Sequence, residues 1–238
     1  MKVLVFDIWG DYGHFRKFYT TTSPLTFSFP PPPTIAGILG AIYGAEKTDY
    51  LTKFHYDCCK TALRIINPVK KVRMGINLIN TKENFWQPVK TRYHEPRTQI
   101  RTEFLKNPHF RIYVHHQDET IFDNLLQRIK NHRSVYSISF GLSELLVDFK
   151  LVGIYEAREI KEVTAELSTP IIVNNLINNH IEIEAGKKYF REKVPIKMNI
   201  DRIIESYDDV IYEPDGKTIK AKVRTCYNLE NGENIAFF

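Results

Sequence analysis

Four consecutive prolines directly precede a glycine-spaced apolar segment, in the stretch FSFPPPPTIAGILGAIYG at residues 27–44. Proline lacks a backbone N–H and its ring clashes with the preceding helical turn, so we expect the prolines to form a short extended rod. Thr34 then suits the N-cap of a helix over 34–45. Each glycine costs a helix about 1 kcal/mol relative to alanine. Something must therefore approach this helix closely, either the sheet beneath it or a phosphate at the N–H groups of Thr34 and Ile35.

The order of the predicted elements is typical of an α+β fold. Outside an inserted segment, strands and helices are predicted at 2–9, 34–45, 61–67, 110–115, 118–131 and 145–155. This is the strand–helix–strand–strand–helix–strand series of ferredoxin-like domains. Beyond it, turn signals between short strands predict hairpins at 181–190, 211–223 and 227–238. We therefore expect a ferredoxin-like domain over residues 1–155 and a small β-rich C-terminal subdomain over 156–238.

The basic residues are concentrated in one part of the chain, whose overall net charge is +5. Residues 70–111 contain ten Lys or Arg and three acids, so this segment has a net charge of +7 and the rest of the chain −2. This distribution favours a polyanion-binding surface, although a solvated basic loop has the same pattern. The irregular stretch at about 79–97 is predicted to be a protruding arm on two basic strands. Its candidate partner-binding residues are Phe85, Trp86 and Tyr93.

The stretch WGDYGHFRKF at residues 9–18 alternates glycine, aromatic and basic residues after the first strand. Such side chains stack on unpaired bases and bind phosphates, but they also line turns packed on a second subdomain. In the arm strands, outward-facing arginines are predicted to contact the phosphates of a single strand, and Glu103 is expected to face outward with them. The predicted RNA-binding residues are Tyr12, His14, Phe15, Arg16, Thr34, Ile35, Arg73, Arg97 and Arg101.

Several classes of function are disfavoured by missing motifs. The sequence has no phosphate-binding GxxxxGK[ST], no GxGxxG after a strand, and no HExxH, CxxC or GxSxG. Its three cysteines give neither a disulfide framework nor a zinc spacing, which favours a reducing compartment and a cytoplasmic location. The apolar runs are too short to cross a bilayer, and the N-terminus is typical of a first strand rather than a signal peptide. We expect no cofactor, no metal and no membrane contact.

Two adjacent histidines, His115 and His116, end a predicted strand and face opposite sides of it. Both cannot bind one metal ion from a regular strand. A histidine here can act as general base on an RNA 2′-hydroxyl, with Tyr43 assisting if the fold brings it near. The alternative is that both histidines are structural, with their ring nitrogens satisfied.

The segment GDYGHFRKFYTTTSPLTFSFPPPPTIAGILGAIYG at 10–44 resembles CRISPR-associated protein family five, a branch of the RAMP superfamily in type I Cascade complexes. The stretch SFGLSELL at 139–146 is similar to a later motif of that family, with Phe140 and Leu145 replacing its leucine and phenylalanine. The similarity covers roughly the first 155 residues and is closest to type I-B members. The residues that match the first motif are Gly10, Phe15, Arg16, Pro32, Pro33, Thr34, Gly37, Leu39, Ile42 and Gly44.

The resemblance implies a modified RRM-like domain that holds the 5′ handle of the crRNA in antiviral defence. Its arm would contact the backbone RAMP subunit, the large subunit would be a second partner, and target DNA would be reached indirectly. In the type I-C branch the protein itself cuts precursor crRNA with Tyr, Lys and His. Tyr43 and His116 match two of these, but His115 stands where the lysine would be. A non-catalytic crRNA-binding subunit is therefore expected, with a metal-independent endoribonuclease that processes precursor crRNA as the alternative.

Overall fold

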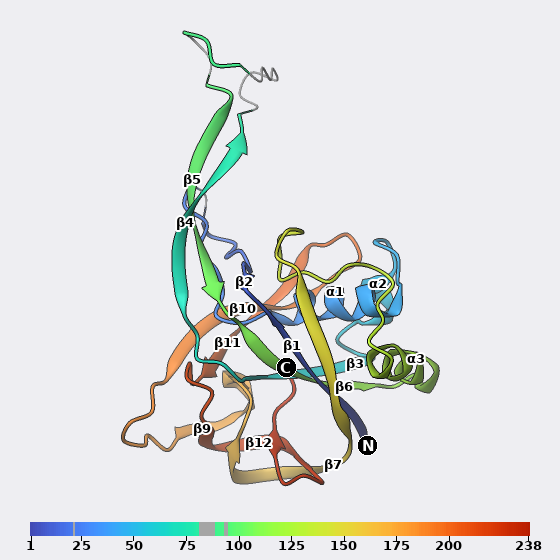
Figure 1. Cartoon of the computed structure of the whole chain (residues 1–238). Coiled ribbons are helices and arrows are strands. Elements are labelled where there is room, and N and C mark those ends of the chain that lie inside the picture. Colours follow the sequence, from blue (N-terminus) through green and yellow to red (C-terminus); the bar gives the residue numbers. More distant parts are fainter. Residues whose placement is uncertain (21, 81–88, 93–94) are drawn as a thin grey trace.

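The main sheet is built around β1 (Lys2–Gly10), as the computed structural model shows (Figure 1). β1 pairs antiparallel with β6 (His109–His116) and with β7 (Val147–Leu167), and β3 (Cys59–Ile65) pairs with β6. With the helices α1 (Pro32–Tyr43) and α3 (Glu119–Lys130), the chain order is β1, α1, β3, β6, α3, β7. These four strands lie in the order β3-β6-β1-β7. The chain therefore folds into an α+β structure with the predicted series of elements.

The structure describes residues 1–20, 22–80, 89–92 and 95–238. The candidate partner-binding residues Phe85, Trp86 and Tyr93 lie outside the described residues. Across the described ranges, no helix is long and apolar enough to cross a membrane.

The two faces of β1 are buried against different parts of the chain. Leu4, Phe6 and Ile8 belong to one apolar cluster with the buried sides of α1 and α3. Val3 and Val5 point the other way and pack with residues of the C-terminal segment. Because side chains alternate across a strand, this single strand joins both clusters. Both helices and apolar residues of the segment 194–212 therefore cover one face of the sheet, and residues of the segment 227–235 cover the other.

The helix α1 begins two residues earlier than predicted. Pro31 is the N-cap, in an extended conformation, and Pro32 and Pro33 are the first two helical residues. The prediction of Thr34 as N-cap is wrong, and so is the expectation that all four prolines form an extended rod. The first turn of a helix tolerates proline, because a backbone N–H there would have no helical partner. The short helix α2 (Tyr50–Lys53) then packs on α1.

The strand β7 is longer than predicted and runs through both expected domains. Its first part pairs with β1 as far as Glu156, which lies opposite Lys2. Its second part pairs with β12 (Ile219–Leu229) from Ala157, which lies opposite Leu229. The change of partner falls between residues 156 and 157, one residue after the expected boundary, while the strand itself is continuous. The division into two domains stays a prediction.

The C-terminal strands pair differently from two of the predicted hairpins. β12 pairs with β7, β9 and β13, whereas β11 pairs with β10 and β8. Only the hairpin at 227–238 is confirmed, and those at 181–190 and 211–223 are wrong, because the strands flanking each turn join different sheets. The bounds are β8 Ile171–Ile172, the 3-10 turn η2 Val173–Asn175, β9 Leu176–Ile181, β10 Phe190–Met198, β11 Ile204–Tyr212 and β13 Asn234–Ile235.

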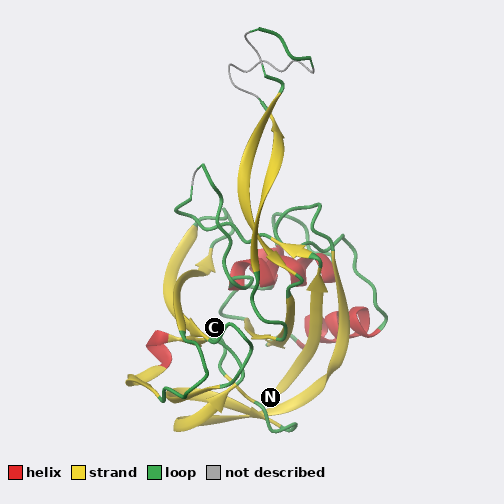
Figure 2. Cartoon of the chain, turned by 60° about the vertical axis from the view of Figure 1, so that its left-hand side comes forward, coloured by secondary structure: helices red, strands yellow, loops and turns green. Residues whose placement is uncertain are grey.

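β4 (Lys71–Ile79) and β5 (Arg97–Lys106) form a long antiparallel hairpin that projects from the body (Figures 1 and 2). Its base is joined to the body by β2 (Tyr12–Gly13), which pairs with the end of β5. Toward the tip, the described residues of both strands are half-buried or exposed. The described outer residues of β4 and β5 are therefore held by the backbone ladder and have no core on either face.

Candidate nucleic-acid interface

The two segments that carry the family resemblance lie against each other in the structure. The N–H of His14 donates to the carbonyl oxygen of Phe140 over 2.9 Å. The rings of Phe15 and Phe140 meet edge to face with centroids 5.6 Å apart. Gly141 has a φ of +94°, and a Cβ there would lie 1.9 Å from the carbonyl oxygen of His14. Only glycine fits this junction, which joins the loop after β1 to the loop before β7.

A groove of about 390 Å³ lies along the open side of α1. At its edge, the guanidinium of Arg202 lies 5.5 Å from the ring centroid of Tyr50. A Cβ on Gly40 would lie 2.8 Å from the Cβ of Tyr50, whereas a Cβ on Gly37 would lie 3.9 Å from the Cε2 of the Tyr50 ring. Gly40 therefore permits close packing of α2, and Gly37 keeps the groove open. Residues that line the groove include Thr34, Gly37, Tyr50, Ser137, Ser139 and Arg202.

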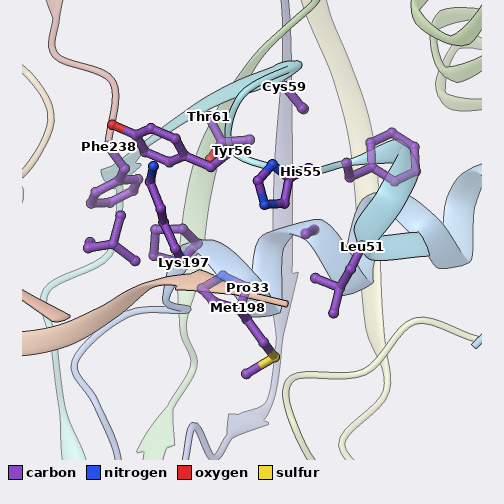
Figure 3. Close-up of a pocket in the computed structure, with 13 residues that line it drawn as sticks. Pro33, Leu51, His55, Tyr56, Cys59, Thr61, Lys197, Met198 and Phe238 are labelled. Atoms are coloured by element: carbon purple, nitrogen blue, oxygen red, sulfur yellow. The ribbon is translucent and has the colours of Figure 1, made fainter. Parts of the chain in front are cut away.

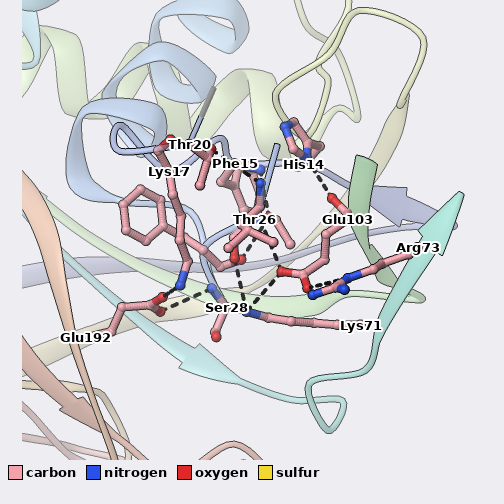
Figure 4. A network of polar contacts seen from close by, with 12 residues as sticks. His14, Phe15, Lys17, Thr20, Thr26, Ser28, Lys71, Arg73, Glu103 and Glu192 are labelled. Atoms are coloured by element: carbon pink, nitrogen blue, oxygen red, sulfur yellow. Dashed lines mark hydrogen bonds and ion pairs between the residues drawn. The ribbon is translucent and has the colours of Figure 1, made fainter. Parts of the chain in front are cut away.

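A polar network anchors the base of the hairpin to the loop at 14–28 (Figure 4). The carboxylate of Glu103 lies 3.6 Å from the Lys71 amine and 3.7 Å from the Arg73 guanidinium. It also accepts a hydrogen bond of 3.3 Å from the backbone N–H of Thr26. The Glu103 side chain is 12% exposed, so the expectation that it faces outward is wrong. Its pairing with two cations draws it into the base of the hairpin.

Lys17 and Glu192 form a second, more buried ion pair in the same network, with side chains 13% and 10% exposed. Burial disfavours the charged amine of Lys17, but the hydrogen bond and charge of Glu192 outweigh this and raise its pKa. The Ser28 N–H donates to Glu192 over 3.4 Å, and the Ser28 hydroxyl bonds with the Tyr212 hydroxyl at 2.7 Å. The loop at 14–28 is thereby fastened to β10 and β11.

Three of the predicted RNA-binding residues have buried side chains, namely His14, Phe15 and Ile35. Burial is the largest influence on His14 and lowers its pKa, while its Nδ1 is hydrogen-bonded to the Glu103 carbonyl oxygen at 2.7 Å. The N–H groups of Thr34 and Ile35 both donate to the Pro31 carbonyl oxygen. These residues therefore have packing or capping partners inside the protein, and the idea that Ile35 faces a ligand is wrong.

The predicted arginines are exposed, and Tyr12 is half-buried beside the hairpin. Arg97 and Arg101 lie on β5, and Arg73 on β4 has a side chain that is 63% exposed. Arg16 lies in the loop at the hairpin base and donates to the Thr20 carbonyl oxygen over 3.1 Å. The structure thus brings these four cations to the hairpin and its base. Their contact with phosphates stays a prediction.

Two exposed aromatic residues were missed by the sequence reasoning. Phe18 and Tyr19 are 49% and 58% exposed, and they follow the buried Phe15 in the same run. The Phe18 ring packs on Tyr207 of β11, with centroids 4.6 Å apart. The aromatic and basic run at 15–19 was the available signal for Phe18 and Tyr19. Nothing in the local sequence places Tyr207 beside them.

The candidate catalytic histidines are held by the backbone. His116 is 5% exposed, its Nδ1 accepts the N–H of Asp118 over 3.0 Å, and its Nε2 lies 2.8 Å from the Lys53 carbonyl oxygen. The Phe54 ring packs edge-on with both Tyr43 and His116, each with centroids 5.8 Å apart. The Nδ1 of His115 bonds with the Lys2 carbonyl oxygen at 2.9 Å. Among the described residues, no three His, Cys, Asp or Glu are grouped to hold a metal ion.

A second, smaller pocket lies between α1, the α2–β3 segment and β10 (Figure 3). Its cavity of about 20 Å³ has room for roughly one water molecule. The Lys197 amine lies 4.3 Å from the Tyr56 ring centroid and 3.8 Å from the Asp57 carboxylate. This pocket is too small for a nucleotide, and its cation already has partners.

The fold of this chain is similar to the folds of three solved chains from CRISPR proteins and complexes. The chain is similar to a crystal structure of a CRISPR protein from Archaeoglobus fulgidus, with 14% identity, a TM-score of 0.58, and coverage of 99% of this chain and 98% of that one. It is also similar to a chain of a CRISPR RNA-guided surveillance complex, with 11% identity, a TM-score of 0.54 and coverage of 92% and 91%. A chain of the type III-B Cmr-beta complex bound to cognate target RNA and AMPPnP has 14% identity, a TM-score of 0.51 and coverage of 92% and 86%.

Sequence comparison gives the family. No curated protein sequence matches the chain. The family described as CRISPR-associated protein (Cas_Cas5) matches residues 3–224, which is nearly the whole chain and includes both motifs that meet at Gly141. This chain belongs to the Cas5 family of CRISPR-associated proteins.

Proposed function

We propose that this protein is a non-catalytic crRNA-binding subunit of a type I CRISPR interference complex, Cascade, and that it holds the 5′ handle of the crRNA. The observation that carries the proposal is the set of exposed arginines on the hairpin of a Cas5 family chain. The basic excess of the chain is confined to the segment that builds this hairpin. The basic residues of the hairpin would therefore form one continuous surface that binds a polyanion.

The register of the hairpin supports contact with an extended strand. On β5, Arg101 lies opposite Gly75 of β4. Arg73 of β4 lies two residues closer to the base of the hairpin than Gly75, opposite Glu103. Outward side chains on one strand are about 6.6 Å apart, close to the spacing of phosphates in an extended single strand. Arg97 continues the row toward the tip, and Arg16 approaches it from the base. Four phosphate contacts are therefore proposed.

The salt dependence of single-stranded RNA binding tests this proposal. Four contacts give a slope of log K against log salt of roughly −3, since each contact contributes about −0.7. Each of Arg16→Ala, Arg73→Ala, Arg97→Ala and Arg101→Ala should flatten the slope by about 0.7 and weaken all RNA sequences similarly. The control is Arg158→Ala, an exposed arginine of β7 on the body of the protein. Unchanged slopes in all four variants would contradict the RNA surface.

The alternative function, metal-independent cleavage of precursor crRNA, requires a histidine that reaches the RNA. The buried position of His116 and the bonds at both of its ring nitrogens weigh against this role. Phe54, packed between Tyr43 and His116, weighs against their joint action on one hydroxyl. Incubation with repeat RNA in EDTA separates the two functions. Only the alternative yields fragments that end in a 2′,3′-cyclic phosphate.

We further propose that the hairpin contacts the adjacent backbone RAMP subunit, with the large subunit as a second partner and target DNA as an indirect one. Exposed apolar side chains near the tip support this, since Leu78, Ile79 and Val89 are 46%, 57% and 66% exposed. Deleting residues 80–96 should abolish co-purification with the backbone subunit and leave the fold intact. Unchanged assembly would contradict the contact. We also propose that the fold is the ferredoxin-like RAMP fold, that the complex is of subtype I-B, and that the protein is cytoplasmic.

A further inference from the structure

We propose that Phe18, Tyr19 and Tyr207 form a stacking platform for unpaired bases of a single-stranded nucleic acid. The platform lies beside the base of the hairpin. The inference rests on the proposed function, because it places the bases of a strand whose phosphates the hairpin arginines would contact. Phosphate contacts alone hold a strand in position, and stacking adds a site for its bases.

The three rings form one cluster from two distant parts of the chain. The Phe18 and Tyr207 centroids are 4.6 Å apart with the rings tilted by 48°, and Phe18 meets Tyr19 edge to face at 5.1 Å. Phe18 and Tyr19 keep about half of their surface in solvent. A folded chain usually buries rings that have such neighbours available, so exposed aromatic faces in a cluster indicate a binding surface.

The loop that carries Phe18 and Tyr19 is held in place. Arg16 and Thr26 form an antiparallel bridge, and the Lys17 N–H donates to the Leu25 carbonyl oxygen over 2.9 Å. The buried ion pair between Lys17 and Glu192 fastens the same loop to β10, which pairs with the strand of Tyr207. The rings are therefore presented on a preorganised loop, which lowers the entropic cost of binding.

Cations around the rings identify the occupant as a nucleic acid. The Lys193 amine lies 5.8 Å from the Tyr207 centroid, and the Lys17 amine, which is paired with Glu192, lies 5.8 Å from the Tyr19 centroid. Lys193 and Arg16 are exposed. Among the acids on β11, Asp209 lies opposite Lys193 and is paired with Arg191, and Asp208 accepts a hydrogen bond from Asn174. Glu205 is exposed. An apolar protein partner would account for the rings but not for these cations, whereas a single strand uses both.

The platform is continuous with the hairpin arginines. The Lys71 amine donates to the Thr26 carbonyl oxygen over 3.0 Å, and Thr26 and Arg73 both contact the Glu103 carboxylate. Figure 4 shows Lys17, Thr26, Lys71 and Arg73 in this one network. A strand that follows the arginine row toward the base of the hairpin therefore arrives beside the exposed rings.

A double-mutant cycle between protein rings and nucleic-acid bases tests the platform. Short unstructured RNA and DNA of one sequence, each intact or with one position made abasic in turn, are titrated against the full chain. Phe18→Leu and Tyr19→Leu should each weaken binding of the intact strands by about 5- to 150-fold, the worth of one stacked base. When the base that stacks on the ring is made abasic, most of the difference in affinity between the wild type and the variant should disappear. The matched control is Phe190→Leu, because Phe190 is also 49% exposed but stacks on Tyr212 instead.

The outcomes separate the platform from the proposed function. Equal losses for RNA and DNA, an unchanged salt slope and a silent control support the platform. Unchanged affinity in both variants, or an equal loss with intact and abasic strands, overturns it. Loss confined to RNA would assign the site to the 2′-hydroxyl and also overturn stacking. Variants that keep RNA binding but lose co-purification with another subunit would make the rings a protein contact. A wild-type chain without salt-dependent RNA binding would instead overturn the proposed function.

Discussion

Replacing Gly141 with alanine should open the junction between the two family motifs. A Cβ at this position would lie 1.9 Å from the His14 carbonyl oxygen, whereas real Cβ contacts are not shorter than 3.0 Å, so the two segments must separate by about 1.1 Å. The hydrogen bond from the His14 N–H to the Phe140 carbonyl oxygen spans the same junction. The partner atom is backbone, so no side-chain rotation relieves the clash.

The expected cost is the sum of three terms. A non-glycine residue in the left-handed region costs about 1–2 kcal/mol, and loss of a backbone hydrogen bond costs about 1 kcal/mol. Displacing the fully buried Phe140 ring from Phe15 and Phe110 costs about 1 kcal/mol more. Together they predict a loss of about 3–4 kcal/mol in the free energy of unfolding.

Gly186→Ala is the matched control. Gly186 also has a positive φ, of +78°, but no atom of the described residues lies within 4 Å of the added Cβ, so only the backbone cost of about 1–2 kcal/mol applies. For a chain of this size, 1 kcal/mol corresponds to about 2–4 °C in the thermal midpoint. Gly141→Ala should therefore melt about 4–8 °C below Gly186→Ala when both are followed by circular dichroism. Equal midpoints for the two variants would refute the argument.

Three further predictions concern buried groups. Because burial lowers the pKa of His14 below its usual 6.5, the neutral ring contributes stability above pH 6.5, and this stability is lost as the pH falls through the folded pKa. His14→Gln should remove this part of the acid sensitivity when urea unfolding is followed at several pH values. Identical pH profiles for the variant and the wild type would contradict this prediction. Glu192→Gln should lower the free energy of unfolding by about 3–5 kcal/mol, because it leaves the Lys17 amine buried without its carboxylate. The double variant Lys17→Met with Glu192→Leu should be nearly as stable as the wild type in thermal unfolding. A double variant less stable than Glu192→Gln would show that the pair is not buried in solution. His116→Ala should lower the thermal midpoint, because the His116 ring is buried and hydrogen-bonded. It should leave the level of mature crRNA in cells unchanged. Accumulation of uncut precursor would support the endoribonuclease.

The sequence by itself determined the features that depend on near neighbours. The helix α3 was predicted within one residue at each end, because its apolar period and its cap are local, and Asp118 indeed accepts the N–H groups of Thr120 and Ile121. The series of β1, α1, β3, β6, α3 and β7, and the family, followed from patterns of the same kind. The charge of the hairpin segment is likewise a property of composition.

Only the tertiary structure decided which side chains of these segments are free. In the run at 15–19, Phe15 is buried against Phe140 while Phe18 and Tyr19 are exposed, because the loop before β7 covers one part of the run and not the other. Glu103 turned inward because two cations and a backbone N–H meet there. The strands that flank the turns at 181–190 and 211–223 joined different sheets, β9 and β12 in the sheet of β7, and β10 and β11 in another. Each of these outcomes depends on contacts between residues far apart in the chain, and local propensity carries no information about them.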